Sequence, residues 1–294
     1  MVLVFLHPLR RGEDDMGNKL TILDIIEKKT KNEKFTMLTA YDAAFASLLD
    51  GLGIDILLVG DSLGMVILGY ESTVPVTMDE MIHHAKAVKR GVRSSLLVGD
   101  MPFLSYQAGK DTAIANAGRF LKEAGCDGVK VEGGIEVCDI VHALVTAGIP
   151  VMGHIGLTPQ TASQLGGYRV QGRDLQSARR LLDAARALNE VGVFSLVLEC
   201  IPDRLAGRIT ELISVPTIGI GAGPFCDGQV LVTHDLLGLF ERFTPRFVRR
   251  YADLSSQIKD AVSAFKEDVS TARFPGEEHS FSIADEVLKG LGED

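Results

Sequence analysis

Ionisable residues follow several apolar runs of this chain, at the points where buried strands are expected to end. The pentapeptide LLVGD occurs twice, at positions 57–61 and 96–100, and closes both times on an aspartate, Asp61 and Asp100. Further ionisable groups close four other apolar runs: Asp42 in FTMLTAYD, Lys130 and Glu132 in GVKVE, His154 in PVMGH and Glu199 in SLVLE. So much charge at the ends of buried strands predicts a functional site.

The spacing of these residues predicts a metal site. Alternate residues of a strand share a face, so both aspartates are expected on the face of the first and third residues of LLVGD, and Lys130 shares a face with Glu132. Carboxylates about 4 Å apart repel by roughly 4 kcal/mol per pair at an effective dielectric of about 20. A hard divalent cation relieves that repulsion, and all-oxygen ligands favour Mg²⁺. We therefore expect Asp61, Asp100 and Glu132 to bind Mg²⁺.

Each residue also has a purely structural interpretation. An aspartate at a strand end often caps a helix or closes a turn. Lys130 could serve only as the ion-pair partner of Glu132, and His154 could be a hydrogen-bonded core histidine. Glu199 is harder to explain this way, because a carboxylate after four apolar residues needs a partner or a raised pKa, and a raised pKa suits a general base.

The elements that position these residues follow a repeating pattern of helix, glycine and apolar run. Gly53, Gly125, Gly148 and Gly192 stand where a helix C-cap needs a left-handed residue. Eight strand-like runs occur, at 35–42, 55–61, 95–100, 128–134, 150–156, 195–201, 216–221 and 229–235. Helical periodicity separates them, with Asp111 and Asp174 as expected N-caps and a capping box at Thr77 and Glu80.

Eight such units predict an α/β fold, a single-domain (β/α)8 TIM barrel, with a doubly wound sheet as the second choice. The active site of such a barrel lies at the C-terminal ends of its strands. We expect the barrel with its C-terminal helix over residues 19–265 and a polar tail over 266–294, with the helix starting near FVRRYADL. Residues 1–18 are expected to be an extension outside the barrel pattern, disordered or foreign to it, and Met16 is the expected native start.

Composition excludes several classes of protein. The 294-residue chain has 46% hydrophobic and 23% charged residues, as soluble globular proteins do. Its formal net charge of -9 and lack of a basic run argue against nucleic acid as a partner. The N-terminal MVLVFLHPLRR is too short and interrupted to be a signal peptide or a membrane span. Four scattered cysteines favour reduced thiols and a cytoplasmic protein.

Ten strings in colinear order, from about Lys19 to Ser282, resemble the ketopantoate hydroxymethyltransferase family. They are VGDSLGMV, STVPVTMDEM, GDMPFLSY, KVEGG, GHIGLTPQ, GGYRVQG, IGIGAG, DGQVLV, FVRRYA and FPGEEHSF. The resemblance implies a Mg²⁺-dependent (β/α)8 enzyme that transfers a one-carbon unit from 5,10-methylenetetrahydrofolate to 3-methyl-2-oxobutanoate and forms 2-dehydropantoate. It also implies a ring-based homo-oligomer, often a decamer.

The resemblance assigns roles to the residues already named. Asp61, Asp100 and Glu132 match the carboxylates of the metal site, directly or through water, and Glu199 matches the proposed general base. The residues that match those holding the keto acid are Asp61, Ser62, Asp100, Lys130 and His154. The substrate and the folate come from the resemblance alone.

Two other classes of protein stay open. A different Mg²⁺-dependent keto-acid barrel, of the phosphoenolpyruvate mutase and isocitrate lyase kind, shares the metal chemistry, although the sequence lacks a KKCGH-like cysteine loop. A barrel that has lost catalysis and serves in binding or assembly is the other, but all of the strand-end carboxylates are present.

Overall fold

The structure, a computed structural model, describes residues 18–162, 167 and 169–291, so the expectations for the N-terminal extension and for Met16 lie outside the described residues. The chain divides into two compact units. The first reaches Thr233 and includes Pro245–Val248, and the second comprises His234–Thr244 and the residues from Arg249 onward. The predicted domain limits at 18 and 265 stay predictions, although position 265 falls inside a helix.

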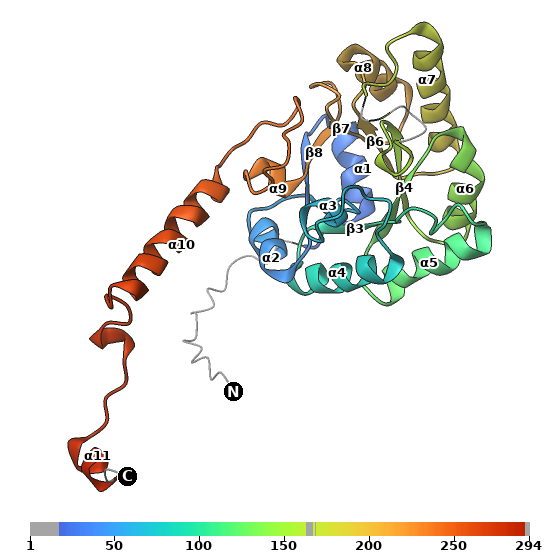
Figure 1. Cartoon of the computed structure of the whole chain (residues 1–294). Coiled ribbons are helices and arrows are strands. Elements are labelled where there is room, and N and C mark those ends of the chain that lie inside the picture. The colour runs from blue at the N-terminus through green and yellow to red at the C-terminus, as the bar shows by residue number, and fades with distance from the viewer. Residues whose placement is uncertain (1–17, 163–166, 168, 292–294) are drawn as a thin grey trace. The chain divides into compact units, whose positions relative to one another are not determined.

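The first unit is a closed barrel of eight parallel strands in chain order, as predicted (Figure 1). Each strand pairs with the next, and β8 pairs with β1. The strands are β1 (Phe35–Thr39), β2 (Ile56–Val59), β3 (Leu96–Asp100), β4 (Gly128–Glu132), β5 (Val151–Gly156), β6 (Ser195–Glu199), β7 (Thr217–Ile220) and β8 (Gly228–Leu231).

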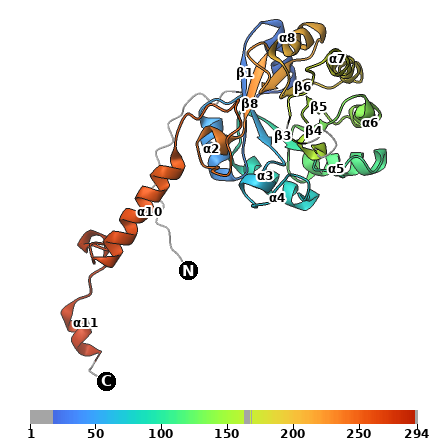
Figure 2. The same cartoon turned by 45° about the horizontal axis from the view of Figure 1, so that its top comes forward.

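Helices surround the strands, and Figures 1 and 2 show α4 to α8 as an outer ring. The α-helices are α1 (Ile22–Thr30), α2 (Ala43–Gly51), α3 (Leu63–Val66), α4 (Met78–Gly91), α5 (Lys110–Lys122), α6 (Cys138–Thr146), α7 (Leu175–Glu190), α8 (Asp203–Leu212), α9 (Thr233–Leu236), α10 (Leu254–Ser270) and α11 (Asp285–Gly290). Short 3₁₀ turns lie at η1 (Ile135–Val137), η2 (Pro159–Thr161) and η3 (Glu277–His279).

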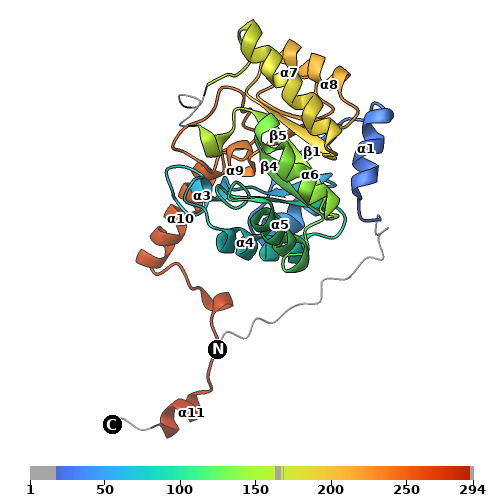
Figure 3. The same ribbon diagram turned by 90° about the vertical axis from the view of Figure 1, so that its right-hand side faces the viewer.

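Apolar residues pack in two layers because the strands are buried on both faces. One cluster joins the outward residues of the strands to the helices, and a second fills the inside of the barrel. Helix α1 closes the N-terminal end: Lys28 and Lys29 form ion pairs with Asp55 and Asp227, which directly precede β2 and β8. Figure 3 shows α1 and α3 at opposite ends of the barrel, and the C-terminal end stays available for a site.

Most of the predicted helix signals are confirmed. The four C-cap glycines have φ values between 68° and 94°, and the capping boxes at Thr77 and Asp174 are formed. The prediction that Asp111 caps its helix is wrong, because Gly109 is the N-cap and Asp111 lies in the first turn. A carboxylate in the first turn still interacts favourably with the helix dipole.

The predicted start of the C-terminal helix near FVRR is also wrong, because the helix begins later in the chain. Helix α10 begins at Leu254, where Asp253 caps it by accepting a hydrogen bond from the Ser256 backbone. The backbone before α10 makes other hydrogen bonds: the Tyr251 amide donates to the backbone carbonyl of Leu236. Phe247 packs against Gly221, where a Cβ would approach its ring to 2.8 Å. None of the described helices has the length and apolar character needed to cross a membrane.

Candidate active site

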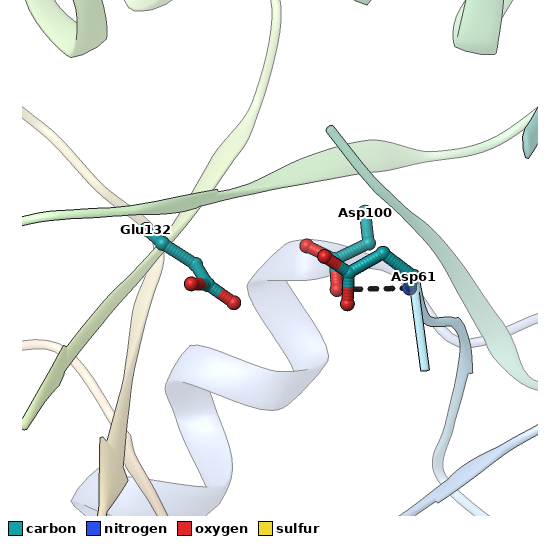
Figure 4. A group of neighbouring side chains, drawn as sticks. All are labelled: Asp61, Asp100 and Glu132. Atoms are coloured by element: carbon teal, nitrogen blue, oxygen red, sulfur yellow. Dashed lines mark hydrogen bonds between the residues drawn. The ribbon is translucent and has the colours of Figure 1, made fainter. Parts of the chain in front are cut away.

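Three carboxylates from consecutive strands meet at the C-terminal end of the barrel. One oxygen each of Asp61, Asp100 and Glu132 lies within 4.8 Å of the others, and all three residues are buried. Figure 4 shows their carboxylates turned toward a common region. The prediction that these three side chains form one cluster is confirmed. Asp42 does not join it: its side chain caps α2 by accepting the Phe45 amide, which is the structural interpretation.

Lys130 lies among these carboxylates, on the inward face of β4 that it shares with Glu132. Its Nζ donates to Asp100 Oδ1 at 2.6 Å and to Glu132 Oε1 at 3.2 Å. Burial would lower the pKa of Lys130, but Asp100, Glu132 and Asp61 raise it above its ordinary value. Burial would likewise raise the pKa of Glu132, yet Lys130 and His154 lower it to about 2. Lys130 is thus a charged ammonium that pairs with both Asp100 and Glu132. The structural interpretation of the sequence considered only the pair with Glu132.

Asp61 reaches the cluster by a different route from the one predicted. Leu57 and Val59 pack outward against the helices, and Leu58 is the residue of that run that faces the barrel interior. The expectation that Asp61 shares an inward face with Leu57 and Val59 is therefore wrong. β2 ends at Val59, and the following turn carries Asp61 inward, where its amide donates to Asp100 Oδ2 at 3.3 Å.

The protein's own cations do not balance these charges. Burial raises the pKa of Asp61 well above its ordinary value, and Asp100 and Glu132 raise it further. Burial also raises the pKa of Asp100, against the lowering effect of Lys130. Burial is the largest cause of both shifts, and repulsion from neighbouring carboxylates adds to it, a repulsion that a bound cation would relieve.

His154 stands between two carboxylates. On the inward face of β5, its Nδ1 is 3.3 Å from Glu132 Oε1 and its Nε2 is 3.2 Å from Glu199 Oε2. Neither nitrogen makes a well-angled hydrogen bond to a described residue, so the contacts are ion pairs at short range. Burial and Lys130 would lower the pKa of His154, but Glu132 and Glu199 raise it to about 9. The imidazole is then charged at neutral pH, unlike an ordinary core histidine.

Glu199 ends β6 at the rim of the cluster. Its side chain retains 15% of its accessible surface, against 2% for its neighbour His154. Glu199 therefore has the partner that its position at a strand end requires, and it also has access to a bound molecule. Ser62 follows Asp61 directly, and its hydroxyl lies 2.8 Å from that of Tyr41. The structure thus brings all the predicted site residues to one end of the barrel.

Two functional candidates were missed in the sequence. Gln160 and Tyr106 are buried in this cluster, and the Gln160 side chain donates to Asp61 Oδ2 at 2.9 Å. Both are neutral residues in segments that follow strands, so charge and strand periodicity do not single them out. The signal available was their presence in two of the resemblance strings, GHIGLTPQ and GDMPFLSY.

The donor set fits a divalent metal ion. Ligands about 2.1 Å from an octahedral ion lie about 3.0 to 4.2 Å apart, so the three carboxylate oxygens need only small shifts or a bridging water. When Asp61, Asp100, Glu132 and Glu199 are ionised, the two positive charges of Lys130 and His154 leave a net charge of -2, which a divalent cation would neutralise. Asp61, Asp100 and Glu132 are the residues that could hold it.

Known proteins resemble this chain over most of its length. The family model described as ketopantoate hydroxymethyltransferase matches residues 19–277. A protein of Syntrophomonas wolfei named 3-methyl-2-oxobutanoate hydroxymethyltransferase is 56% identical over 93% of this chain and 99% of its own length. A protein of the same name from Desulfotalea psychrophila is 59% identical over 89% of this chain and 94% of its own length.

A solved structure shows the same fold. The crystal structure of phosphoenolpyruvate phosphomutase from Streptomyces platensis subsp. rosaceus has a TM-score of 0.59 over 92% of this chain and 96% of that chain, at 14% identity. This likeness supports the (β/α)8 architecture alone, whereas the family match and the two relatives cover most of the chain, the relatives at 56% and 59% identity. The chain belongs to the ketopantoate hydroxymethyltransferase family.

Proposed function

We propose that the strand-end cluster is the active site in which this chain transfers a hydroxymethyl group from 5,10-methylenetetrahydrofolate to 3-methyl-2-oxobutanoate, forming 2-dehydropantoate. The single observation that carries the proposal is the meeting of Asp61, Asp100 and Glu132 beside Lys130 and Glu199 in a member of this family. In the net reaction the keto acid loses one proton from C3, C3 bonds to the methylene carbon, and water supplies the hydroxyl as tetrahydrofolate leaves.

The metal in this proposal is Mg²⁺, held by Asp61, Asp100 and Glu132 directly or through water. The ligand atoms of this described group are carboxylate oxygens, which suit this hard cation. When bound, Mg²⁺ would polarise the keto oxygen of the substrate as a Lewis acid. Lys130, His154 and Ser62 would hold the keto acid together with Asp61 and Asp100. The bound cation together with Lys130 would supply the positive charge with which an acidic protein binds an anionic substrate.

Glu199 is the proposed proton acceptor. It is the most exposed of the ion-paired carboxylates in the cluster and lies at its rim, where a substrate C3 can approach. Removal of the C3 proton transfers it to the Glu199 carboxylate. His154, whose Nε2 lies 3.2 Å from Glu199 Oε2, would orient that carboxylate.

Exchange of the C3 proton with solvent deuterium tests this assignment. With Mg²⁺ and 3-methyl-2-oxobutanoate but no folate, Glu199→Gln should lower the exchange rate by at least about 100-fold, the usual contribution of a general base. Glu190→Gln, at the exposed end of α7, is the matched control and should exchange at the wild-type rate. Undiminished exchange in Glu199→Gln would refute the assignment. Failure of the wild-type protein to form 2-dehydropantoate with folate would refute the function itself.

The remaining family-derived expectations are proposals of the same kind. We expect a homo-oligomer. If it is a decamer, analytical ultracentrifugation at micromolar concentration should give the mass of ten chains. A cytoplasmic location is supported by the four cysteines, all of which are free thiols.

A further inference from the structure

We infer that Gln160 is a positioning residue for the metal site, whose side-chain amide holds the carboxylate of Asp61 toward Asp100 and Glu132. The inference rests on the proposal that these three carboxylates bind a divalent cation. It assigns a role to a residue that does not itself touch the metal or the substrate.

Every hydrogen-bonding group of the Gln160 side chain has a partner. Its Nε2 donates to Asp61 Oδ2 and to the backbone carbonyl of Met101, both at 2.9 Å. Its Oε1 accepts the Tyr106 hydroxyl at 2.8 Å. Because a backbone carbonyl can only accept, the Met101 contact requires the NH₂ group on that side, which fixes the orientation of the amide. One N–H of the amide therefore binds Met101, and the other N–H binds Asp61.

The backbone of Gln160 contacts a second member of the site. Its amide donates to Glu132 Oε2 at 3.2 Å. The Tyr106 hydroxyl lies 2.9 Å from the Glu132 backbone carbonyl, so its single proton is shared between this carbonyl and Gln160 Oε1. Gln160 and Tyr106 are 2% and 0% exposed, so water does not compete for these bonds. One short turn, η2, therefore reaches from the end of β5 to Asp61 in the turn after β2 and to Glu132 at the end of β4.

Asp61 needs such support more than the other two carboxylates do. Asp100 and Glu132 lie within strands, where ladder hydrogen bonds set the backbone, but Asp61 lies in the turn after β2. Outer partners that bind one oxygen of a carboxylate leave the other free to face a metal, and their loss commonly costs 10- to 100-fold in metal affinity.

A purely structural role for Gln160 is the alternative. In that case the side chain would only anchor η2 to Met101 and Tyr106, and any effect on metal binding would not depend on Asp61. A double-mutant cycle separates the two roles, because coupling is expected only between residues that act through each other.

The experiment measures binding of Mn²⁺ alone to the full-length, metal-free protein by electron paramagnetic resonance. Gln160→Met keeps the side-chain volume and removes the amide, and should weaken Mn²⁺ binding by about 10-fold or more. In the Asp61→Ala background, which removes the oxygen that Gln160 binds, the same substitution should change the affinity by less than about 3-fold. Tyr106→Phe, which removes only the hydroxyl that donates to the amide oxygen, should weaken binding by about 3-fold, an effect smaller than loss of the amide itself.

Gln229→Met is the matched control. Gln229 is an exposed glutamine on β8 whose side chain donates to the Gly223 carbonyl at 2.9 Å, and the variant should bind Mn²⁺ as the wild type does. Equal loss from Gln160→Met in both backgrounds, or unchanged affinity in Gln160→Met and Tyr106→Phe, would overturn the inference while leaving the metal site intact. Wild-type affinity retained in Asp61→Ala would instead overturn the metal site, and the inference with it.

Discussion

The two copies of LLVGD form neighbouring walls of one site, yet they are arranged differently. In the register of β2 and β3, Leu57 pairs with Leu97 and not with Leu96, so the copies are offset by one residue. The offset turns equivalent residues to opposite faces. Leu96 and Val98 of the second copy face the barrel interior, whereas in the first copy Leu58 does so. Both copies nevertheless deliver their final aspartate to the carboxylate cluster.

The difference lies in how each aspartate is held. Asp100 is the last residue of a strand and accepts a hydrogen bond from the ammonium group of Lys130. Asp61 lies two residues beyond its strand and accepts one from the neutral amide of Gln160. One aspartate is thus part of a buried ion pair, and the other depends on a turn and an amide. Identical sequence can supply the same ligand by two different structural routes.

The largest expected effect is an opposite change in stability when each aspartate loses its charge. In EDTA at pH 8, Asp100→Asn should lower the free energy of unfolding by about 3 kcal/mol, because it breaks a buried ion pair with Lys130. The loss of this pair outweighs the relief of the burial that raises the pKa of Asp100. Asp61→Asn should raise it by about 1 kcal/mol, because Asn keeps a partner for Gln160 and removes an unfavourable buried charge. Urea unfolding measures both changes.

The sign for Asp61 follows from proton linkage. Its pKa is raised in the folded protein, so the folded state binds its proton more tightly and stability falls as pH rises above the ordinary value of 3.8. The stability gained by Asp61→Asn should therefore increase as pH rises from 3.8 to the raised pKa of Asp61 in the folded protein. Equal destabilisation by both substitutions would show that the two aspartates are held in the same way.

The sequence was sufficient for the barrel and for most of the site, and the reasons are physical. Continuous apolar runs between helical segments identify buried parallel strands, and period-two spacing correctly placed Lys130 beside Glu132 on one face. The face of Asp61 could not be predicted, since where β2 ends depends on its pairing with both neighbours. Gln160 could not be predicted either, because its burial depends on how the segment after β5 folds back.

The central glycines of the two copies offer a second way to test the offset. A Cβ on Gly99 would lie 2.3 Å from the Phe120 ring, which is fully buried in α5. Gly99→Ala should therefore cost about 2 kcal/mol in the free energy of unfolding by overpacking the layer between β3 and the helices. Adding Phe120→Leu should recover part of that loss. A neutral Gly99→Ala would mean that this position does not face α5.

The smallest effect is expected at the equivalent glycine of the first copy. A Cβ on Gly60 would meet Ser62 Oγ at 2.8 Å, and its other near neighbours are 3.6 Å away. A hydroxyl can rotate, so Gly60→Ala should change the free energy of unfolding by less than about 0.5 kcal/mol. The displaced Ser62 hydroxyl should lose its 2.8 Å contact with Tyr41 and raise the KM for the keto acid about 3-fold, the loss expected from one weakened hydrogen bond, with Mn²⁺ affinity unchanged. Ser62→Ala combined with Gly60→Ala should have no further effect on KM than Ser62→Ala alone. A stability loss as large as that of Gly99→Ala would instead place both glycines against helices, and the one-residue offset would not explain how the two walls differ.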